Sequence, residues 1–357
     1  MANFDLSNLA LQAVCPGNEI LYDDKGMPSI MVKIPKLTYK QLGMGESNAI
    51  HPAFIVNGKE VDAIWISKFH NIIKNGRAYS LPGQDPAASL ALETAINACT
   101  AKGPGWHLMT QMERGLLIQW CENNGHVPLG NNDYGKHVTE NSYIAIPTHF
   151  TDGKIGRTAT GTGPLTWYHD NSPSGIDGLG GNVRDWSGGI RTVYGELQIL
   201  ANNNGADSSH SQLAGGLEWL AIKGEDGSFI EPNGSGTTEG SVKMDWIGGK
   251  LTYSTTITDA APGSHNCTFG SIVCDESIGD NAKLLLQSLG MMPYNADGLS
   301  KAHMCYFNNA EAERSFSCGG HYNNASGGLA AFSGHYSRTL THANLGFRSA
   351  FVVLPPV

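Results

Sequence analysis

The chain has 357 residues, among them 45 glycines, 12 tyrosines and 7 tryptophans, and only 15% of its residues are charged. This composition is typical of a compact, loop-rich protein and argues against a disordered or coiled-coil chain. A formal net charge of -9 argues against a nucleic-acid partner, because binding to a phosphate backbone normally rests on a basic surface.

Residues 1–26 have neither a basic start nor an uninterrupted apolar core, so we expect no signal peptide. No stretch is apolar over the roughly 18 residues that a membrane span needs, so we expect no membrane insertion. The seven cysteines form an odd number without CxxC spacing, which favours reduced core thiols over disulfides and disfavours a zinc site.

The first predicted elements are strands. Residues 27–37 alternate as a strand does, and Pro35 places this strand at a sheet edge, since proline cannot donate to a ladder. Two β-type runs, residues 53–56 and 63–69, flank the turn signal Asn57-Gly58, which predicts that the two runs form a hairpin.

Two helices are predicted next. Residues 83–101 have apolar residues at helical spacing, with Pro86 near the first turn. In the second helix Thr110 is the N-cap, Glu113 completes a capping box, and Asn124-Gly125 ends the helix. The apolar side of this second segment is interpreted as core and consists of Trp106, Met109, Met112, Leu116, Trp120 and Cys121.

The rest of the chain is punctuated by glycine. Residues 125–181 predict long irregular loops, which indicate a loop-heavy fold or a functional rim. Residues 190–262 alternate short β-type runs with glycine turns, which predicts hairpins. A short helix is expected within residues 280–291, with further β-type runs at 303–309 and 347–357.

Residues 314–348 are dense in Gly, Ser, Asn, His and Tyr, and almost free of charge up to Arg338. Tyrosine and histidine offer large faces with a polar tip, while serine, asparagine and glycine offer adaptable hydrogen bonding, a mixture that antibody loops use. The segment is therefore either a ligand-binding surface or a plain polar loop.

Four phrases resemble one family. HLMTQMERG at 107–115, GNVRDW at 181–186, SCGGHY at 317–322 and GFR at 346–348 are similar, in the same order, to RLPTEAEWE, GNVWEW, RGGSW and GFR. Those phrases belong to the formylglycine-generating-enzyme-like branch of the C-type lectin fold. The resemblance spans roughly residues 30–357.

The resemblance implies an α+β, loop-rich fold with mixed short strands and two main helices. It divides the chain into an N-terminal segment with the first strand, 1–45, and a domain, 46–357. Within the domain we expect a β-hairpin insertion at about 190–262 and a variable region at about 304–348. Trp186 and Val183 are expected to be buried, Asn182 and Asp185 to satisfy the glycine turns, and Arg348 with Gly346 to fix the entry to the last strand.

Enzymes of that branch hold copper with two cysteines beyond the GGSW phrase. The segment after Gly320 contains no cysteine, and Cys318 precedes the glycines. The HxxxHxE iron motif of the related sulfoxide synthases is absent among the thirteen histidines. We therefore expect no catalytic residue and no cofactor. The alternatives are a metal-dependent, oxidase-like enzyme with an unusual active site and a structural virion protein.

Residues 319–348 also resemble the variable region of proteins diversified by retroelements, whose pattern is GGxWNNGSNAGxFALNLNNARSNSNxNIGFR. The matches are Asn323, Asn324, Ser326, Ala331, Arg338 and the closing residues 345–348. In that family the adenines of template Asn codons are randomised. Such changes can produce the residues at the departures from the pattern, Ser333, His335, Tyr336, Leu340 and His342, and account less directly for Thr339 and Thr341.

This second resemblance implies a ligand- or receptor-binding protein, with a phage tail tip as the expected location and a bacterial cell surface as the alternative. The expected partner is a protein or glycan on a target cell; the ligand's identity and the oligomeric state stay open. The expected frame is Gly319, Gly320, Ala331, Arg338 and 346–348. The expected ligand-binding residues are Tyr306, Asn308, His321, Tyr322, Asn323, Phe332, Ser333, His335, Tyr336, Leu340 and His342.

A metal site built from the histidines and tyrosines of this group is disfavoured, because no carboxylate accompanies them. Calcium would need clustered oxygen ligands, and Asn131, Asn132 and Asp133 are interpreted as a turn.

Overall fold

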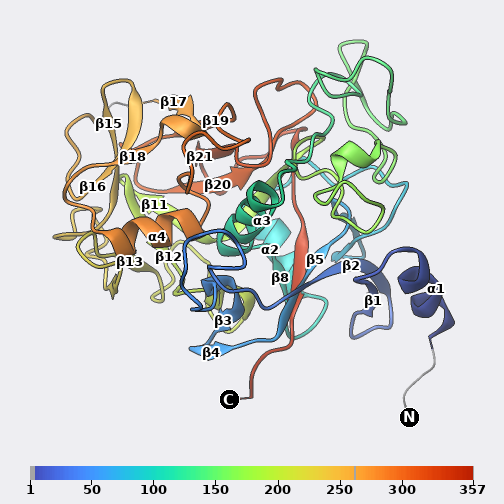
Figure 1. Ribbon diagram of the computed structural model, residues 1–357, viewed down its shortest axis with the longest axis horizontal. Helices are drawn as coiled ribbons and strands as arrows, with labels where there is room; N and C mark the ends of the chain where they lie inside the picture. Colours follow the sequence, from blue (N-terminus) through green and yellow to red (C-terminus); the bar gives the residue numbers. More distant parts are fainter. Residues whose placement is uncertain (1–4, 261–262, 357) are drawn as a thin grey trace.

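Two β-sheets organise the chain in the computed structural model, which describes residues 5–260 and 263–356 (Figure 1). The smaller sheet has five strands in the order β1-β2-β5-β23-β8, and the larger has twelve. Long irregular connections join them, so the architecture is mixed α+β and loop-rich, as the sequence predicts. No helix of the described ranges is long and apolar enough to cross a membrane.

The five-stranded sheet differs from the expected arrangement. It consists of β1 (Asn18–Tyr22), β2 (Pro28–Pro35), β5 (Ala63–Ser67), β23 (Ser349–Val352) and β8 (Trp106–Leu108). β2 lies between β1 and β5, so the prediction of an edge strand is wrong. Pro35 is tolerated because it ends β2, beyond residues 28–32 that pair with β1.

The turn at Asn57-Gly58 forms, with φ of 54° and 70° at its two residues. It joins only β3 (Ile55–Val56) to β4 (Lys59–Glu60). The run that follows, β5, pairs with β2 and β23, so the prediction that residues 53–56 pair with it is wrong. Two further two-stranded ribbons are β6 (Ile72–Lys74) with β7 (Arg77–Tyr79), and β9 (Phe150–Thr151) with β10 (Lys154–Ile155).

Helix α2 (Leu92–Thr100) begins later than predicted, because Ser89 has a φ of 58° and Ala91 is extended. Helix α3 (Gln111–Asn123) has the predicted capping box between Thr110 and Glu113. Helix α4 (Asp280–Ser288) also lies where it is predicted, and α1 (Leu6–Val14) precedes β1. A Cβ on Gly115 of α3 would lie 1.9 Å from the Ser288 carbonyl oxygen, so glycine permits the close approach of α3 and α4.

The larger sheet contains the predicted hairpins. Its strands are β11 (Arg184–Val193), β12 (Glu196–Ile199), β13 (Leu220–Ile222), β14 (Phe229–Ile230), β15 (Lys243–Ile247), β16 (Lys250–Ser254), β17 (His265–Thr268), β18 (Val273–Cys274), β19 (Met304–Phe307), β20 (Arg314–Cys318), β21 (Phe332–Tyr336) and β22 (Leu345–Gly346). β20 lies between β11 and β21, and β21 pairs in parallel with β19.

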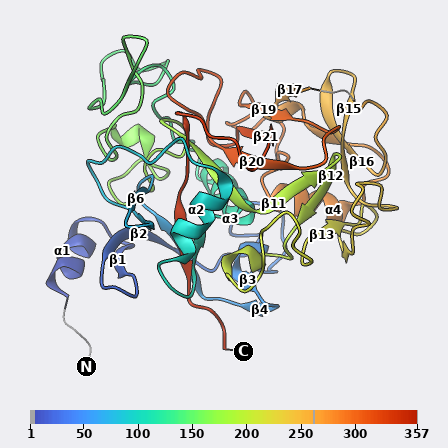
Figure 2. The same ribbon diagram turned by 180° about the vertical axis from the view of Figure 1, so that it is seen from behind.

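The main hydrophobic core is formed by helices α3 and α4 with both sheets, and the two helices stand in front of the larger sheet in Figure 1. Ile64 and Val352 are two of its members from the smaller sheet. A second, smaller core packs α2 against Trp186 and Phe347 on the other side, which faces the viewer in Figure 2. The connections between β20, β21 and β22 therefore emerge from a sheet that is covered on both faces. They lie at the end of the molecule opposite the two termini (Figure 1).

Candidate functional site

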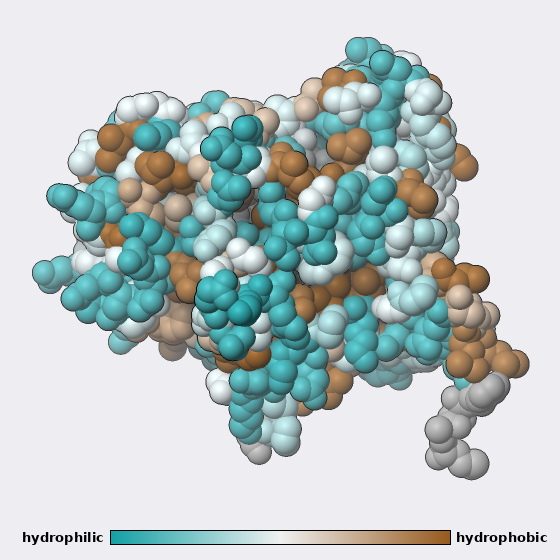
Figure 3. Space-filling view, viewed as in Figure 1, coloured by the Kyte–Doolittle hydropathy of each residue, from teal (hydrophilic) through white to brown (hydrophobic). Residues whose placement is uncertain are grey.

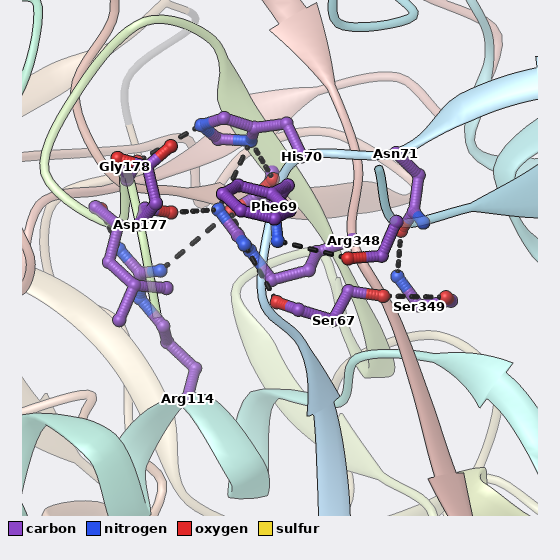
Figure 4. A network of polar contacts seen from close by, with 12 residues as sticks. Ser67, Phe69, His70, Asn71, Arg114, Asp177, Gly178, Arg348 and Ser349 are labelled. Carbon is purple, nitrogen blue, oxygen red and sulfur yellow. Dashed lines mark hydrogen bonds and ion pairs between the residues drawn. The ribbon is translucent and has the colours of Figure 1, made fainter. Parts of the chain in front are cut away.

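A buried network of charged groups includes His70, Arg114 and Arg348 (Figure 4). The Asp185 carboxylate is 3.0 Å from Nδ1 of His70, 3.5 Å from Nε of Arg348 and 3.8 Å from Nη1 of Arg114. All four side chains are buried. Burial raises the pKa of Asp185, but the neighbouring His70, Arg348 and Arg114 outweigh it and lower that pKa to about 2.

This network joins distant parts of the chain. Arg348 donates from Nη1 to the carbonyls of Ser67 and Lys68 at the end of β5, and from Nη2 to the carbonyl of Asp177. Nε2 of His70 lies 3.0 Å from the Gly178 oxygen and 3.2 Å from the Gly181 oxygen. Arg348 thus fixes the entry to β23, as predicted.

Two predictions about the GNVRDW phrase need correction. Asp185 does not bond to the glycine turn, because its oxygens are taken by the buried cations, and His70 contacts the turn instead. Asn182 binds the backbone of Thr158, donating to its carbonyl and accepting from its amide. Val183 and Trp186 are buried as expected.

Arg114 is a residue that sequence reasoning missed. From α3 it donates to the carbonyls of Leu329, at 2.8 Å, and Leu179, at 2.7 Å. An arginine on the buried face of a helix is the signal that could have indicated this role, because such a charge needs partners.

Five of the eleven predicted ligand-binding residues are buried: Asn308, His321, Tyr322, Phe332 and Ser333. Phe332 packs in the core with its ring 6.0 Å from that of Phe316. The Asn308 side chain accepts from the amides of Ala310 and Glu311 and so closes a turn. These side chains are part of the packing or of the backbone support and do not face solvent in this structure.

The other six predicted residues reach the surface. Asn323 and His342 are exposed, while Tyr306, His335, Tyr336 and Leu340 are half-buried. The structure brings three of them together: the His335 ring lies 4.1 Å from that of Tyr336 and 5.8 Å from that of Tyr306.

A short chain of hydrogen bonds connects His342 to His321. Nδ1 of His342 lies 2.6 Å from Oδ1 of Asn344, and Nδ2 of Asn344 donates to Nδ1 of His321 at 3.0 Å. Burial, followed by the charge of Arg184, lowers the pKa of His321 to about 3 and that of His335 to about 4. Both histidines are therefore neutral at pH 7.

Arg184 lies at the centre of this group and was also missed by sequence reasoning. Its Nη1 donates to Oγ of Ser333 at 2.8 Å and to Oη of Tyr336 at 2.6 Å. The guanidinium carbon lies 5.8 Å from the Tyr336 ring centroid. Arg184 therefore connects the start of β11 with two side chains of β21.

The loops of residues 134–165 lie beside the C-terminal segment. The Tyr134 amide donates to the Tyr322 carbonyl, and Nη1 of Arg157 donates to the Ala343 carbonyl. These loops expose Tyr143, Ile144, Ile146 and Phe150. Figure 3 shows apolar side chains scattered among polar ones over this part of the molecule, at the upper right.

All seven cysteines carry free thiols, as expected. Cys318, the cysteine nearest the glycines, is buried, and burial raises its pKa to about 11. Within residues 5–260 and 263–356, no three His, Cys, Asp or Glu side chains are grouped so that they could hold a metal ion.

No protein-family model matches the chain, and no curated protein matches it. Among solved structures, it is similar to "Structure of PvdO from Pseudomonas aeruginosa" with 12% sequence identity and a TM-score of 0.37. The alignment covers 95% of this chain and 99% of that chain. The strands and helices of the chain itself establish a mixed α+β, loop-rich architecture.

Proposed function

We propose that this protein is a ligand-binding protein of the formylglycine-generating-enzyme-like branch of the C-type lectin fold, with a C-terminal surface diversified by a retroelement. By resemblance to phage members of the retroelement-diversified family, its target is a protein or glycan on a cell surface and its location is the phage tail tip. The support comes from how residues 319–348 are held.

One observation carries the proposal: neighbouring elements hold this segment through its main-chain carbonyls. Amides of other elements donate to the carbonyls of Tyr322, Arg338, His342 and Asn344, at 2.7 to 3.0 Å. Arginine side chains donate to the carbonyls of Leu329 and Ala343. Any residue type supplies a carbonyl, so most side chains here can change without loss of these anchors.

The frame positions have no such freedom. A Cβ on Gly320 would lie 2.3 Å from the Gly180 oxygen, and Gly319 has a φ of 89°. Ala331 is buried. Arg338 pairs with Glu313 and Glu93. These residues match the pattern of the resembling family. Among the predicted ligand-binding residues between them, Asn323 and His342 are exposed, and His335, Tyr336 and Leu340 are half-buried.

Binding would rest on the ring group of Tyr306, His335 and Tyr336. Aromatic side chains that are partly held in place lose little conformational entropy when they contact a partner, and such residues dominate many interfaces. Leu340, His342 and Asn323 would supply surrounding contacts. The buried Phe332, Tyr322 and Asn308 are assigned to the frame.

The test is deep sequencing of the gene in a population that carries it, together with its flanking DNA. We expect substitutions concentrated at codons 333, 335, 336, 340 and 342, a near-identical template repeat, and a reverse-transcriptase gene nearby. Codons 319, 320, 331 and 348 should be invariant. Variation spread evenly over both sets, or the lack of a template repeat, would refute diversification.

A stability measurement provides an independent check. Libraries that randomise the exposed Asn323 and His342 should yield mostly folded proteins, because substitutions away from buried features usually change stability by about 0.5 kcal/mol or less. The same randomisation at Gly320, Ala331 and Arg348 should yield mostly unfolded ones. Equal yields from the two libraries would contradict the division into surface and frame.

A further inference from the structure

The side chain of Arg184 is unusual in its combination of burial and charge. The residue is 7% exposed, yet no carboxylate among the described residues lies within ion-pair distance of it. By contrast, Arg114 and Arg348 are both paired with Asp185. A buried cation without a counter-charge is costly, so its retention needs an explanation.

The Arg184 guanidinium has N–H groups that donate to no residue of the described ranges. Nη1 is used by the hydroxyls of Ser333 and Tyr336, while Nε and Nη2 have no hydrogen-bond partner within the described ranges. Both nitrogens retain some contact with solvent. Two N–H-bearing atoms of a fixed guanidinium therefore remain available at the surface.

The side chains around Arg184 do not neutralise it. His321 and His335 lie close enough for its charge to lower their pKa, and both are neutral. The nearby carboxylates are engaged elsewhere: Glu313 pairs with Arg191 and Arg338, and Glu311 pairs with Arg314. Nδ1 of His335 is buried without a partner, which leaves a second unsatisfied polar atom in the same group.

We propose that Arg184 and the hydroxyls of Ser333 and Tyr336 form a binding site for an anionic group of the ligand, a carboxylate or a sulfate. The planar guanidinium presents Nε and Nη2 as a fork, which matches two oxygens of such a group. The hydroxyls hold the guanidinium in place and can donate to a third oxygen, and the rings of Tyr336 and His335 would border the bound group.

This inference rests on the proposed function and narrows it. Arg184 belongs to β11, outside residues 319–348, so it would be constant while the side chains around it vary. Each diversified form would then keep the guanidinium. Changes at Ser333 and Tyr336 would alter the hydroxyls that hold it, and changes at the other positions would alter what is recognised beside the anionic group. Acidic glycans of a cell surface carry both carboxylates and sulfates.

The test titrates the protein with sodium glucuronate, with glucose as the neutral counterpart, and with sodium sulfate. Binding is followed by ligand-observed NMR for the sugars and by calorimetry for sulfate. We expect glucuronate or sulfate to bind and glucose not to bind. In Arg184→Gln the affinity should fall about ten-fold or more, equivalent to ~1.4 kcal/mol.

Arg77→Gln is the control, because it removes one positive charge from an arginine that Asp23 and Asp24 already neutralise and that is not among the anchors of residues 319–348. It should retain anion affinity. If Arg184→Gln does not fold by circular dichroism, Arg184→Lys takes its place, since it keeps the charge but loses the fork.

Binding of glucuronate alone would assign the site to carboxylates, and binding of sulfate alone would assign it to sulfated groups. No anion binding, equal binding of glucose, or equal losses in the Arg184 and Arg77 variants would overturn the inference. None of these results bears on codon variation, so failure of this site is distinguishable from failure of the proposed function.

Discussion

Replacement of Asp185 by asparagine tests whether the buried charge network holds the frame together. The carboxylate is the anion shared by Arg348 and Arg114, and both arginines are 0% exposed. Asparagine has nearly the same shape and can still accept a hydrogen bond through Oδ1. The substitution therefore removes the charge and leaves the packing almost unchanged.

Removing one partner of a buried ion pair typically costs 3–5 kcal/mol, because the other charge stays buried without compensation. Here the backbone carbonyls of Ser67, Lys68 and Asp177 continue to accept from Arg348. Those carbonyls solvate the cation in part, so we expect the lower end of the range, a loss of about 3 kcal/mol in the free energy of unfolding.

The assay is urea unfolding at pH 7, followed by circular dichroism. Asp62→Asn serves as the control, because Asp62 pairs with Lys36 at 3.3 Å and its side chain is fully exposed. Exposed pairs contribute little, so the control should behave like the original protein. A loss of less than about 1 kcal/mol in Asp185→Asn would refute the reasoning, since buried pairs should far exceed exposed ones.

The pH dependence of stability provides a second test of the same variant. The pKa of Asp185 is lowered from 3.8 to about 2, so its stabilisation is fully present above pH 3.8 and is lost as pH falls toward 2. The difference in stability between the original protein and Asp185→Asn should therefore shrink over that interval. A difference that stays constant down to pH 2 would show that the lost interaction is not electrostatic.

Three further predictions concern other parts of the fold. Thr110→Ala removes the capping box of α3 and the 2.7 Å bond to Asn203, and should lower the free energy of unfolding by ~1–2 kcal/mol in urea titration. Phe332→Ala should lower the free energy of unfolding by ~3–5 kcal/mol, whereas His342→Ala should change it by about 0.5 kcal/mol or less. Similar losses in the two variants would contradict the assignment of Phe332 to the core and of His342 to the surface. Burial lowers the pKa of His51 and of His321 from 6.5 to about 3, so both stabilise the fold above pH 6.5, and that contribution is lost as pH falls toward 3. The thermal midpoint should then decrease from pH 7 to pH 4, and a flat profile would contradict this.

The sequence predicts the elements whose signals are local. The capping box of Thr110 and Glu113, the helix of α4 and the glycine turns of the hairpins all depend on residues a few positions apart. The start of α2 was predicted too early because the spacing of apolar residues continues back through Leu90. The conformation of Ser89, with φ of 58°, interrupts that pattern.

Pairings between distant segments could not be predicted in this way. β5 pairs with β2, near the start of the chain, and with β23, near its end. No local turn signal specifies either partner. The network of His70, Arg114, Asp185 and Arg348 has the same character, because its members come from four separate segments. Only the burial of several charged residues could have indicated that such a network exists.

The composition of residues 314–348 predicts contact chemistry but does not separate surface from core. That separation comes from strand pairing: opposite Phe332 and Ser333 on β21 lie Cys318 and Ser317 of β20, and the register then shifts before Tyr336 pairs with Ser315. Phe332 thereby joins the core, while Ser333 and Tyr336 both reach Arg184. Alternation along β21 alone would place Ser333 and Tyr336 on opposite faces.

The same geometry limits which positions can vary freely. Most of the C-terminal segment is anchored by its main chain, but Ser333 and Tyr336 are held by side-chain bonds to Arg184. A substitution at His342 leaves every main-chain anchor in place, whereas one at Tyr336 releases a guanidinium donor and removes the ring contact with Trp186. Variation at Tyr336 would therefore change the surface and also the orientation of the Arg184 guanidinium, the group that we propose binds the anionic part of the ligand. Position 342, which is exposed, would change the surface alone. Because Ser333 and Tyr336 both accept from Arg184, residues at 336 should covary with those at 333.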